Sequence, residues 1–229
     1  MIAMKISATK ISAEKMFATT LSKRVLLVWL ALPLAGFAGG LETLEAFVKN
    51  VKTGRADFTQ VVTPPAKEGQ VARIKTSSGT FEFSRPGQFK FVYKKPFEQS
   101  IVADGTTLWI HDVDLNQVTA RQQSKALNST PAALIASATD LRALKADFTL
   151  LNEPDKDGLE WVSATPKTKD SQIQTVRIGF RSGNLAALDI LDSFGQNSRM
   201  SFSAFKANSV LDTATFAFKP PVGTDVVQQ

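Results

Sequence analysis

The sequence predicts a mainly β protein of the α+β class, in which about eleven strands form an antiparallel sheet curled into a full or partial barrel. Three observations predict this fold. Short segments with apolar residues at every second position fill most of the chain, and turn signals separate them. An amphipathic helix precedes these segments, and further helical stretches interrupt them near the middle of the chain. Many closely spaced short strands are typical of an antiparallel barrel, and the helices are available to plug or cover it.

The strands are expected where apolar and polar side chains alternate. The clearest case is the pair of segments in which Phe81 and Phe83 share one face of a strand and Phe89 and Phe91 share one face of the next. A tight hairpin is expected at Asp104-Gly105. The expected strands are residues 55–62, 71–84 with a kink at Ser77-Ser78, 88–93, 99–103, 107–112, 117–121, 148–152, 159–165, 175–180, 186–192, 200–206 and 215–218.

Three helical stretches are expected. Residues 41–51 carry apolar side chains at helical spacing with charges between them, and Gly54 is the expected stop. In the middle of the chain, Thr130-Pro131 combines a capping residue with a proline at the first helical position, so residues 130–137 are predicted to be helical. A second short helix or turn is expected at residues 140–144.

Residues 1–38 have the features of a cleaved secretory signal peptide. The segment is basic, an apolar run follows at residues 25–35, and small residues before the expected cleavage point after Ala38 fit a signal peptidase. The apolar run is about half as long as a membrane-spanning helix requires. Residues 39–229 are then a single domain with a formal charge of about +2, because most of the whole chain's +6 lies in the leader. That charge gives no general case for nucleic-acid binding.

The chain offers few residues for catalysis or metal binding. It has no cysteine, which excludes disulfides, thiol chemistry and the acylated cysteine of a lipoprotein. Its single histidine, His111, could act as a general base, but a lone histidine near a strand end is more often a surface residue. Asp112 and Asp114 are interpreted as parts of a turn. With no nucleotide-binding or hydrolase motif in the sequence, we expect no enzyme, no cofactor and no metal.

The aromatic composition is dominated by phenylalanine. Residues 39–229 contain fourteen of the 16 Phe of the chain, with two Trp and one Tyr. Phe has no polar atom that needs a partner when buried, so a Phe-lined interior suits an apolar ligand. The composition alone fits a plain packed core equally well. The predicted architecture favours a cavity, because a barrel of this strand number is wide enough to leave space inside.

Arg85 follows the same alternation as Phe81 and Phe83. A guanidinium on an apolar face needs acceptors, because it cannot lose its charge. Inside a barrel, the available acceptors are the unpaired carbonyl groups at the end of a covering helix, so Arg85 is a candidate latch for a lid that contains Leu134 and Ile135. On the residues alone, an equal alternative is that Arg85 lies at the strand end and extends into water.

Five motifs in order give the chain a resemblance to the LolA family of periplasmic outer-membrane lipoprotein carriers, from about residue 41 to residue 227. They are Phe58-Thr59-Gln60, Arg85-Pro86-x-x-Phe89, Asp104-Gly105-x-x-Leu108-Trp109, Thr130-Pro131 and Phe216-x-Phe218-x-Pro220-Pro221-x-Gly223. Each motif is weak alone, but the five in order are specific.

The resemblance implies an incomplete antiparallel barrel capped by an α-helical lid, and a periplasmic chaperone that shelters the acyl chains of lipoproteins. Such a carrier takes triacylated lipoproteins from an inner-membrane ABC exporter and passes them to an outer-membrane receptor lipoprotein. The family's latch arginine falls on Arg85. The expected lining of the acyl cavity is Phe58, Phe81, Phe83, Phe89, Phe91, Trp109, Leu134 and Ile135. We expect a monomer.

Two other functions stay open at this stage. The same half-barrel could carry another lipid or a glycolipid through the periplasm. A regulatory module that senses lipoproteins is a second alternative, although such a module would normally accompany a further domain or a membrane anchor.

Overall fold

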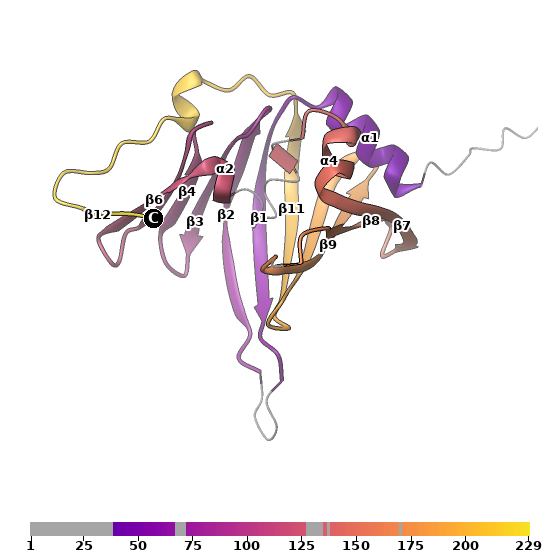
Figure 1. The fold of residues 1–229 in the computed structure, drawn as a ribbon, viewed down its shortest axis with the longest axis horizontal. Helices are drawn as coiled ribbons and strands as arrows, with labels where there is room; N and C mark the ends of the chain where they lie inside the picture. Colours follow the sequence, from indigo (N-terminus) through magenta and orange to yellow (C-terminus); the bar gives the residue numbers. More distant parts are fainter. Residues whose placement is uncertain (1–38, 67–71, 127–134, 137, 170) are drawn as a thin grey trace, which may run out of the picture. The chain divides into compact units, whose positions relative to one another are not determined.

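The computed structural model describes residues 39–66, 72–126, 135–136, 138–169 and 171–229, which all belong to one unit, Phe37–Gln229. Within these residues the strands are β1 (Thr53–Thr63), β2 (Lys75–Ser84), β3 (Gln88–Lys95), β4 (Gln99–Ala103), β5 (Thr107–Asp112), β6 (Gln117–Gln122), β7 (Phe148–Lys156), β8 (Leu159–Pro166), β9 (Ile173–Arg181), β10 (Asn184–Asp192), β11 (Asn197–Ala207) and β12 (Asp225–Gln228). They form a single sheet in the order β12-β6-β5-β4-β3-β2-β1-β11-β10-β9-β8-β7 (Figure 1).

Neighbouring strands of this sheet are antiparallel, except that β12 pairs with β6 in parallel. β1 lies near the middle and pairs with β2 on one side and β11 on the other. β12 and β7 are the two edges and do not pair with each other, so the sheet is open. An open and mainly antiparallel sheet with a few helices confirms the predicted fold class of an incomplete barrel, with twelve described strands instead of about eleven.

The predicted strand at residues 215–218 is wrong. The chain forms a short 3₁₀ helix there, η2 (Thr213–Phe216), and the Asp212 side chain caps it by accepting a hydrogen bond from the backbone N–H of Ala214 at 2.8 Å. Two prolines follow, and a proline has no N–H to donate to a strand ladder. The last strand is β12, which the alternation did not reveal because only four residues form it.

The expected kink in the second strand corresponds to a shift in the pairing of β2 with β3, between Ser78 and Gly79. Gly79 packs directly against the backbone carbonyl of Val92 in β3, and a Cβ atom at this position would overlap that carbonyl. The strand itself begins at Lys75, and the described residues 72–74 are not part of it. The expected start at residue 71 lies outside the described residues.

α1 (Gly40–Asn50) begins one residue before the predicted helix and packs against β7 and β8. Its apolar face, which includes Leu44, Phe47 and Val48, is buried in the core. The helix ends at Asn50, and Gly54, the expected stop, lies in β1.

Shorter helices follow β6. They are α2 (Gln123–Ala126) and α4 (Leu141–Asp147), the latter matching the short helix predicted at residues 140–144. Asp140 caps α4, since its carboxylate accepts a hydrogen bond from the backbone N–H of Ala143 at 2.8 Å. α4 lies beside α1 and contacts β7 (Figure 1). No helix of the described residues is long and apolar enough to cross a membrane.

The main hydrophobic core lies on the face of the sheet that α1 and α4 cover, which we call the inner face. Alternation along β8 shows the two faces, since Val162 and Ala164 belong to this core whereas Trp161 belongs to a small second cluster with Leu159 and Ala187. That second cluster therefore lies on the opposite, outer face.

Candidate functional site

Five phenylalanines of β1, β2 and β3 lie together on the inner face, and each is at most 5% exposed: Phe58, Phe81, Phe83, Phe89 and Phe91. The strand register explains the group, because Phe81 lies directly opposite Phe91 and Phe83 lies opposite Phe89. Residues opposite each other in neighbouring strands point to the same face. All five belong to the expected cavity lining, and the structure brings them into one cluster, which we call the phenylalanine cluster.

Rings of this cluster contact one another. Phe81 stacks on Phe91 with 4.4 Å between ring centroids, and Phe58 meets Phe91 edge-on at 5.6 Å. Tyr93, which the alternation places on the same face, extends the cluster and lies 5.0 Å from Phe58. Burial raises the pKa of Tyr93 to about 12, so the phenol stays neutral and the interior gains no charge here.

Phe47 of α1 extends the cluster at its other end. Its ring lies 6.3 Å from Phe83 and 5.4 Å from Phe180 of β9. Phe47 is not among the expected site residues. Its position on the apolar face of the predicted helix is the feature of the sequence that indicates its burial. The aromatic side chains thus connect three neighbouring strands to α1 and β9 through a continuous set of ring contacts.

Ile135 and Ala136 belong to the same core, with exposed fractions of 3% and 0%. They are helical residues of the segment predicted at 130–137, and Ile135 was expected to face the interior. Leu134, the other expected lid residue, lies outside the described residues.

Trp109 has to be removed from the expected lining. Its neighbour Leu108 belongs to the inner core, so strand alternation places Trp109 on the outer face of β5. There its ring lies 5.5 Å from Phe218, and its indole N–H donates a hydrogen bond to Asp104 at 2.8 Å. The expectation for this tryptophan was wrong because its position in the strand has the opposite parity to that of the lining residues.

Arg85 follows β2 directly, and its guanidinium points into the protein. One Nη donates a hydrogen bond to the carbonyl of Val51, the residue after α1. The charge also lies 5.1 Å from the ring centroid of Phe47 and 5.0 Å from that of Phe83. Within the described part of the chain, the buried Nε and the second Nη have no hydrogen-bond partner. Burial lowers the pKa of Arg85 to about 10, so the group stays charged at neutral pH.

Among the described residues, the hydrogen-bond acceptor of Arg85 is the carbonyl at the end of α1. The expected acceptor was a carbonyl at the end of the mid-chain helix, most of which lies outside the described residues. The described mid-chain residues are held by the backbone of the same turn, because Gly87 N–H donates to the carbonyl of Ala136 at 2.7 Å. Gly87 has a φ of +78°, a conformation that glycine adopts readily.

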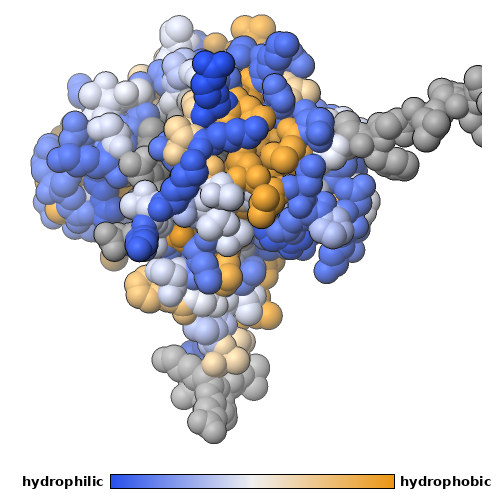
Figure 2. Space-filling model, turned by 45° about the vertical axis from the view of Figure 1, so that its right-hand side comes forward, coloured by the Kyte–Doolittle hydropathy of each residue, from blue (hydrophilic) through white to orange (hydrophobic). Residues whose placement is uncertain are grey.

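A groove with a volume of about 670 Å³ opens at the other end of the sheet, where β3 joins β4 and β5 joins β6. Tyr93 lines it together with two apolar residues at its rim, Phe97 and Leu115, which are 68% and 69% exposed. Figure 2 shows further hydrophobic surface near the lower end of the sheet. The other lining residues are mostly polar: Gln60, Lys75, Thr76, Ser77, Pro96, Gln99, Asp112 and Asp114. Exposed apolar side chains beside polar ones suit an amphiphilic ligand.

The candidate catalytic residues lie apart from the phenylalanine cluster. The ring of His111 lies 5.9 Å from Phe218, on the same outer face as Trp109. Asp112 accepts a hydrogen bond from the backbone N–H of Leu115 at 3.2 Å, as expected for a turn. Among the described residues, no group of three or more His, Cys, Asp or Glu is arranged to hold a metal ion.

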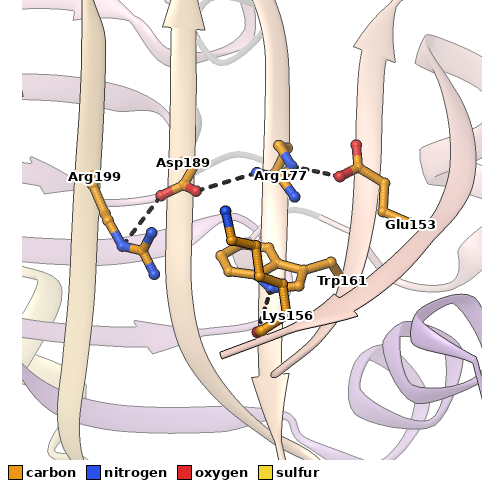
Figure 3. Close-up of polar contacts among 6 residues, drawn as sticks. All are labelled: Glu153, Lys156, Trp161, Arg177, Asp189 and Arg199. Carbon is orange, nitrogen blue, oxygen red and sulfur yellow. Dashed lines mark hydrogen bonds and ion pairs between the residues drawn. The ribbon is translucent and has the colours of Figure 1, made fainter. Parts of the chain in front are cut away.

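The outer face of β7 to β11 carries a charged network above the buried Trp161 (Figure 3). Arg177 donates to Glu153 at 2.6 Å and lies 3.6 Å from Asp189, which also pairs with Arg199 at 3.6 Å. Both guanidinium groups lie over the indole, at 4.8 and 5.6 Å from its centroid. The two guanidinium groups are paired with carboxylates and cover the indole, so the network accounts for the burial of Trp161.

The comparisons with known proteins agree with this architecture. The family profile described as outer membrane lipoprotein carrier protein LolA matches residues 49–219. A protein named outer-membrane lipoprotein carrier protein from Albidiferax ferrireducens is 72% identical over 200 residues, which cover 86% of this chain and 93% of that protein. A protein of the same name from Methylibium petroleiphilum is 50% identical over 206 residues, covering 88% and 98%.

Among solved structures, an uncharacterized conserved protein from Thermus thermophilus has a TM-score of 0.50 at 11% identity, covering 83% of this chain and 97% of that one. This likeness concerns the fold alone. The profile match over most of the chain and the high identity of the two relatives establish that the chain belongs to the LolA family.

Proposed function

We propose that this LolA-family protein is a periplasmic chaperone that carries lipoproteins and shelters their acyl chains against the phenylalanine cluster. The observation that carries the proposal is the set of buried, mutually contacting rings on the inner face of an open sheet. These rings offer dispersion contacts to an acyl chain and contain no polar group that needs a partner. The proposed lining is Phe58, Phe81, Phe83, Phe89, Phe91 and Ile135.

The phenylalanine cluster is already buried by other side chains, so an acyl chain can reach it only by replacing part of the core. Ile135 and Ala136 are buried against the same cluster, and their contacts are apolar, which acyl methylenes can reproduce. Burial contributes about 0.8 kcal/mol per methylene, so complete burial of three acyl chains would amount to tens of kcal/mol. Such binding would exceed what a carrier can release. Partial burial in exchange for the contacts of Ile135 and Ala136 keeps the cargo transferable, as a population shift between two states.

The groove beside Tyr93 is the proposed entrance. Tyr93 lines the groove and also contacts Phe58, so one side chain joins the surface opening to the buried cluster. The polar side chains of the groove lining can hold the glyceryl and peptide part of a lipoprotein while the acyl chains point inward. Arg85 lies at the far end of the cluster and stabilises the closed state by joining α1 to the β2–β3 turn.

We further propose the partners and the location. An inner-membrane ABC exporter supplies the cargo and the energy for loading, and an outer-membrane receptor lipoprotein accepts it. Residues 1–38 act as a cleavable signal peptide, and the mature protein works as a monomer without enzymatic activity.

Depletion of the protein followed by membrane fractionation tests the carrier function. We expect lipoproteins destined for the outer membrane to accumulate in the inner membrane. Mass spectrometry of the purified periplasmic protein adds a second readout, with triacylated lipoprotein as the expected ligand. A bound glycolipid or phospholipid, together with normal lipoprotein sorting after depletion, would refute the proposal.

A further inference from the structure

The β2–β3 and β4–β5 turns are joined by the side chain of Gln123, the first residue of α2. Gln123 is only 4% exposed and is one of four buried polar residues in the described part of the chain. Its Nε2 donates to the carbonyl of Gly87 at 2.8 Å, and its Oε1 accepts from the N–H of Gly105 at 2.9 Å. Its backbone N–H donates to the carbonyl of Thr106 at 2.9 Å. Three hydrogen bonds thus attach the start of α2 to two turns of the sheet.

An amide is the side chain that these partners require. Gly87 offers a carbonyl and needs a donor, while Gly105 offers an N–H and needs an acceptor. A carboxylate at position 123 would place a second acceptor against the Gly87 carbonyl, and an apolar side chain would leave both backbone groups without a partner. The chemistry therefore selects glutamine at this position.

The same β2–β3 turn also holds Ala136, through the hydrogen bond from Gly87 N–H to the Ala136 carbonyl at 2.7 Å. The two attachments differ in kind. Gln123 is bonded by its backbone and by both ends of its side-chain amide, whereas Ala136 is bonded to the turn through its backbone carbonyl and lies with Ile135 among apolar side chains. An acyl chain can replace apolar contacts, but it cannot replace the hydrogen bonds of a buried amide.

We propose that Gln123 is a positioning residue for cargo exchange, which keeps α2 attached to the two turns while Ile135 and Ala136 leave the inner face. The inference rests on the proposed carrier function. Arg85 does not perform this task, because its hydrogen bond goes to Val51 after α1. Loading then breaks the bond between Gly87 and Ala136 and preserves the bond between Gly105 and Gln123.

Amide hydrogen exchange resolved by NMR tests this order of events in the wild-type protein. The amides of Gly87 and Gly105 report separately on the Ala136 and Gln123 contacts. On loading with a synthetic triacylated lipopeptide, we expect exchange at Gly87 to accelerate about tenfold or more, and exchange at Gly105 to stay unchanged. Equal loss of protection at both amides, or unchanged protection at Gly87 in the loaded protein, would overturn the inference alone. Failure of the wild-type protein to bind any acylated ligand would overturn the carrier function with it.

The substitution Gln123→Glu provides a second test. A protonated carboxyl group can donate to Gly87 and accept from Gly105, whereas the ionised form cannot donate. Burial raises the pKa of such a group, so we expect protection of Gly105 and lipopeptide transfer to be near wild type at acidic pH and to fall about tenfold as pH rises. Charged groups also lie in both turns, Arg85 in the β2–β3 turn and Asp104 in the β4–β5 turn. The same measurements on the wild-type protein over the same pH range show how much of the pH dependence comes from these groups.

Gln88→Glu is the matched control, because Gln88 Nε2 donates to the carbonyl of Asp104 at 3.0 Å in the same β4–β5 turn but does not bond α2. We expect this variant to lack the pH-dependent change in transfer. Wild-type transfer by Gln123→Glu at neutral pH, with Gly105 still protected, would overturn the proposal, as would the same pH dependence in Gln88→Glu.

Discussion

The guanidinium of Arg85 donates a hydrogen bond to the carbonyl of Val51, the first residue after α1. The contact joins the β2–β3 turn to the N-terminal helix across 34 residues of chain. The ring of Phe47 in α1 and the ring of Phe83 in β2 each lie about 5 Å from the guanidinium carbon. The guanidinium thus contacts one carbonyl and two rings, while its other buried N–H groups have no hydrogen-bond partner among the described residues. These contacts stabilise one arrangement of α1 and the turn, and removing the cation from water is the cost.

Replacing Arg85 with leucine is expected to leave loading intact and to impair transfer to the receptor. The substitution removes the hydrogen bond and both cation–π contacts, so the closed state no longer competes effectively with bound cargo. Transfer from purified loaded protein to receptor-containing outer membranes measures the effect. Arg55→Leu is the control, because Arg55 is exposed and pairs with Glu82 at 3.4 Å on the protein surface. Transfer at the wild-type rate by Arg85→Leu would refute the latch.

Phe81→Ala is expected to destabilise the folded protein by about 3–5 kcal/mol. Phe81 is fully buried and contacts the rings of Phe83, Phe91 and Phe202, so its removal leaves a cavity that the surrounding rings cannot fill. Urea unfolding followed by circular dichroism measures the change. Phe194→Ala serves as a control, since this side chain is 78% exposed and its loss should change stability by less than about 0.5 kcal/mol. Equal effects at both positions would contradict the described packing.

Phe97→Asp is expected to slow loading about tenfold without lowering stability. The side chain lies at the rim of the groove and is 68% exposed, so the folded state loses little when it becomes polar. An acyl chain that enters beside it loses an apolar contact and meets a charge. Release of lipoprotein from inner-membrane vesicles measures loading. Val222→Asp is the matched control, because Val222 is fully exposed and is not part of the groove lining. Equal loading by both variants would exclude the groove as entrance.

The ionisation of Tyr93 can be followed without labels, because it is the only tyrosine of the chain. Burial raises its pKa to about 12, compared with about 10 in an unfolded chain. Since the folded pKa is the higher one, this group contributes its full stabilisation below about pH 10 and loses it as pH rises towards 12. Ultraviolet absorbance of the phenolate should therefore titrate about two units later in folded protein than in urea. A midpoint near 10 in the folded protein would show that the ring is open to solvent, and Tyr93→Phe should remove the signal.

Local alternation predicted much of the sheet correctly. β4 and β5 have the predicted bounds, and the five phenylalanines fall on one face because the period of a strand is two wherever it lies. The same rule, applied consistently, places Trp109 on the opposite face from Leu108. Its parity within β5 therefore excludes Trp109 from the inner face. At residues 215–218 an alternating pattern does not produce a strand, because Asp212 caps a short 3₁₀ helix that ends at Phe216.

The sequence by itself determined which side chains of a strand share a face, because that depends only on the conformation of a short segment. It left open whether the guanidinium of Arg85 is buried or extends into water. Only the tertiary structure decided what these residues meet. Arg85 donates to Val51, Phe47 packs on Phe180, and Gln123 connects two turns. In each case the partners are separated by many residues of the chain. Hydrogen bonds and ring contacts form only when such segments lie within a few ångströms of each other. A local pattern of residues does not predict that separation.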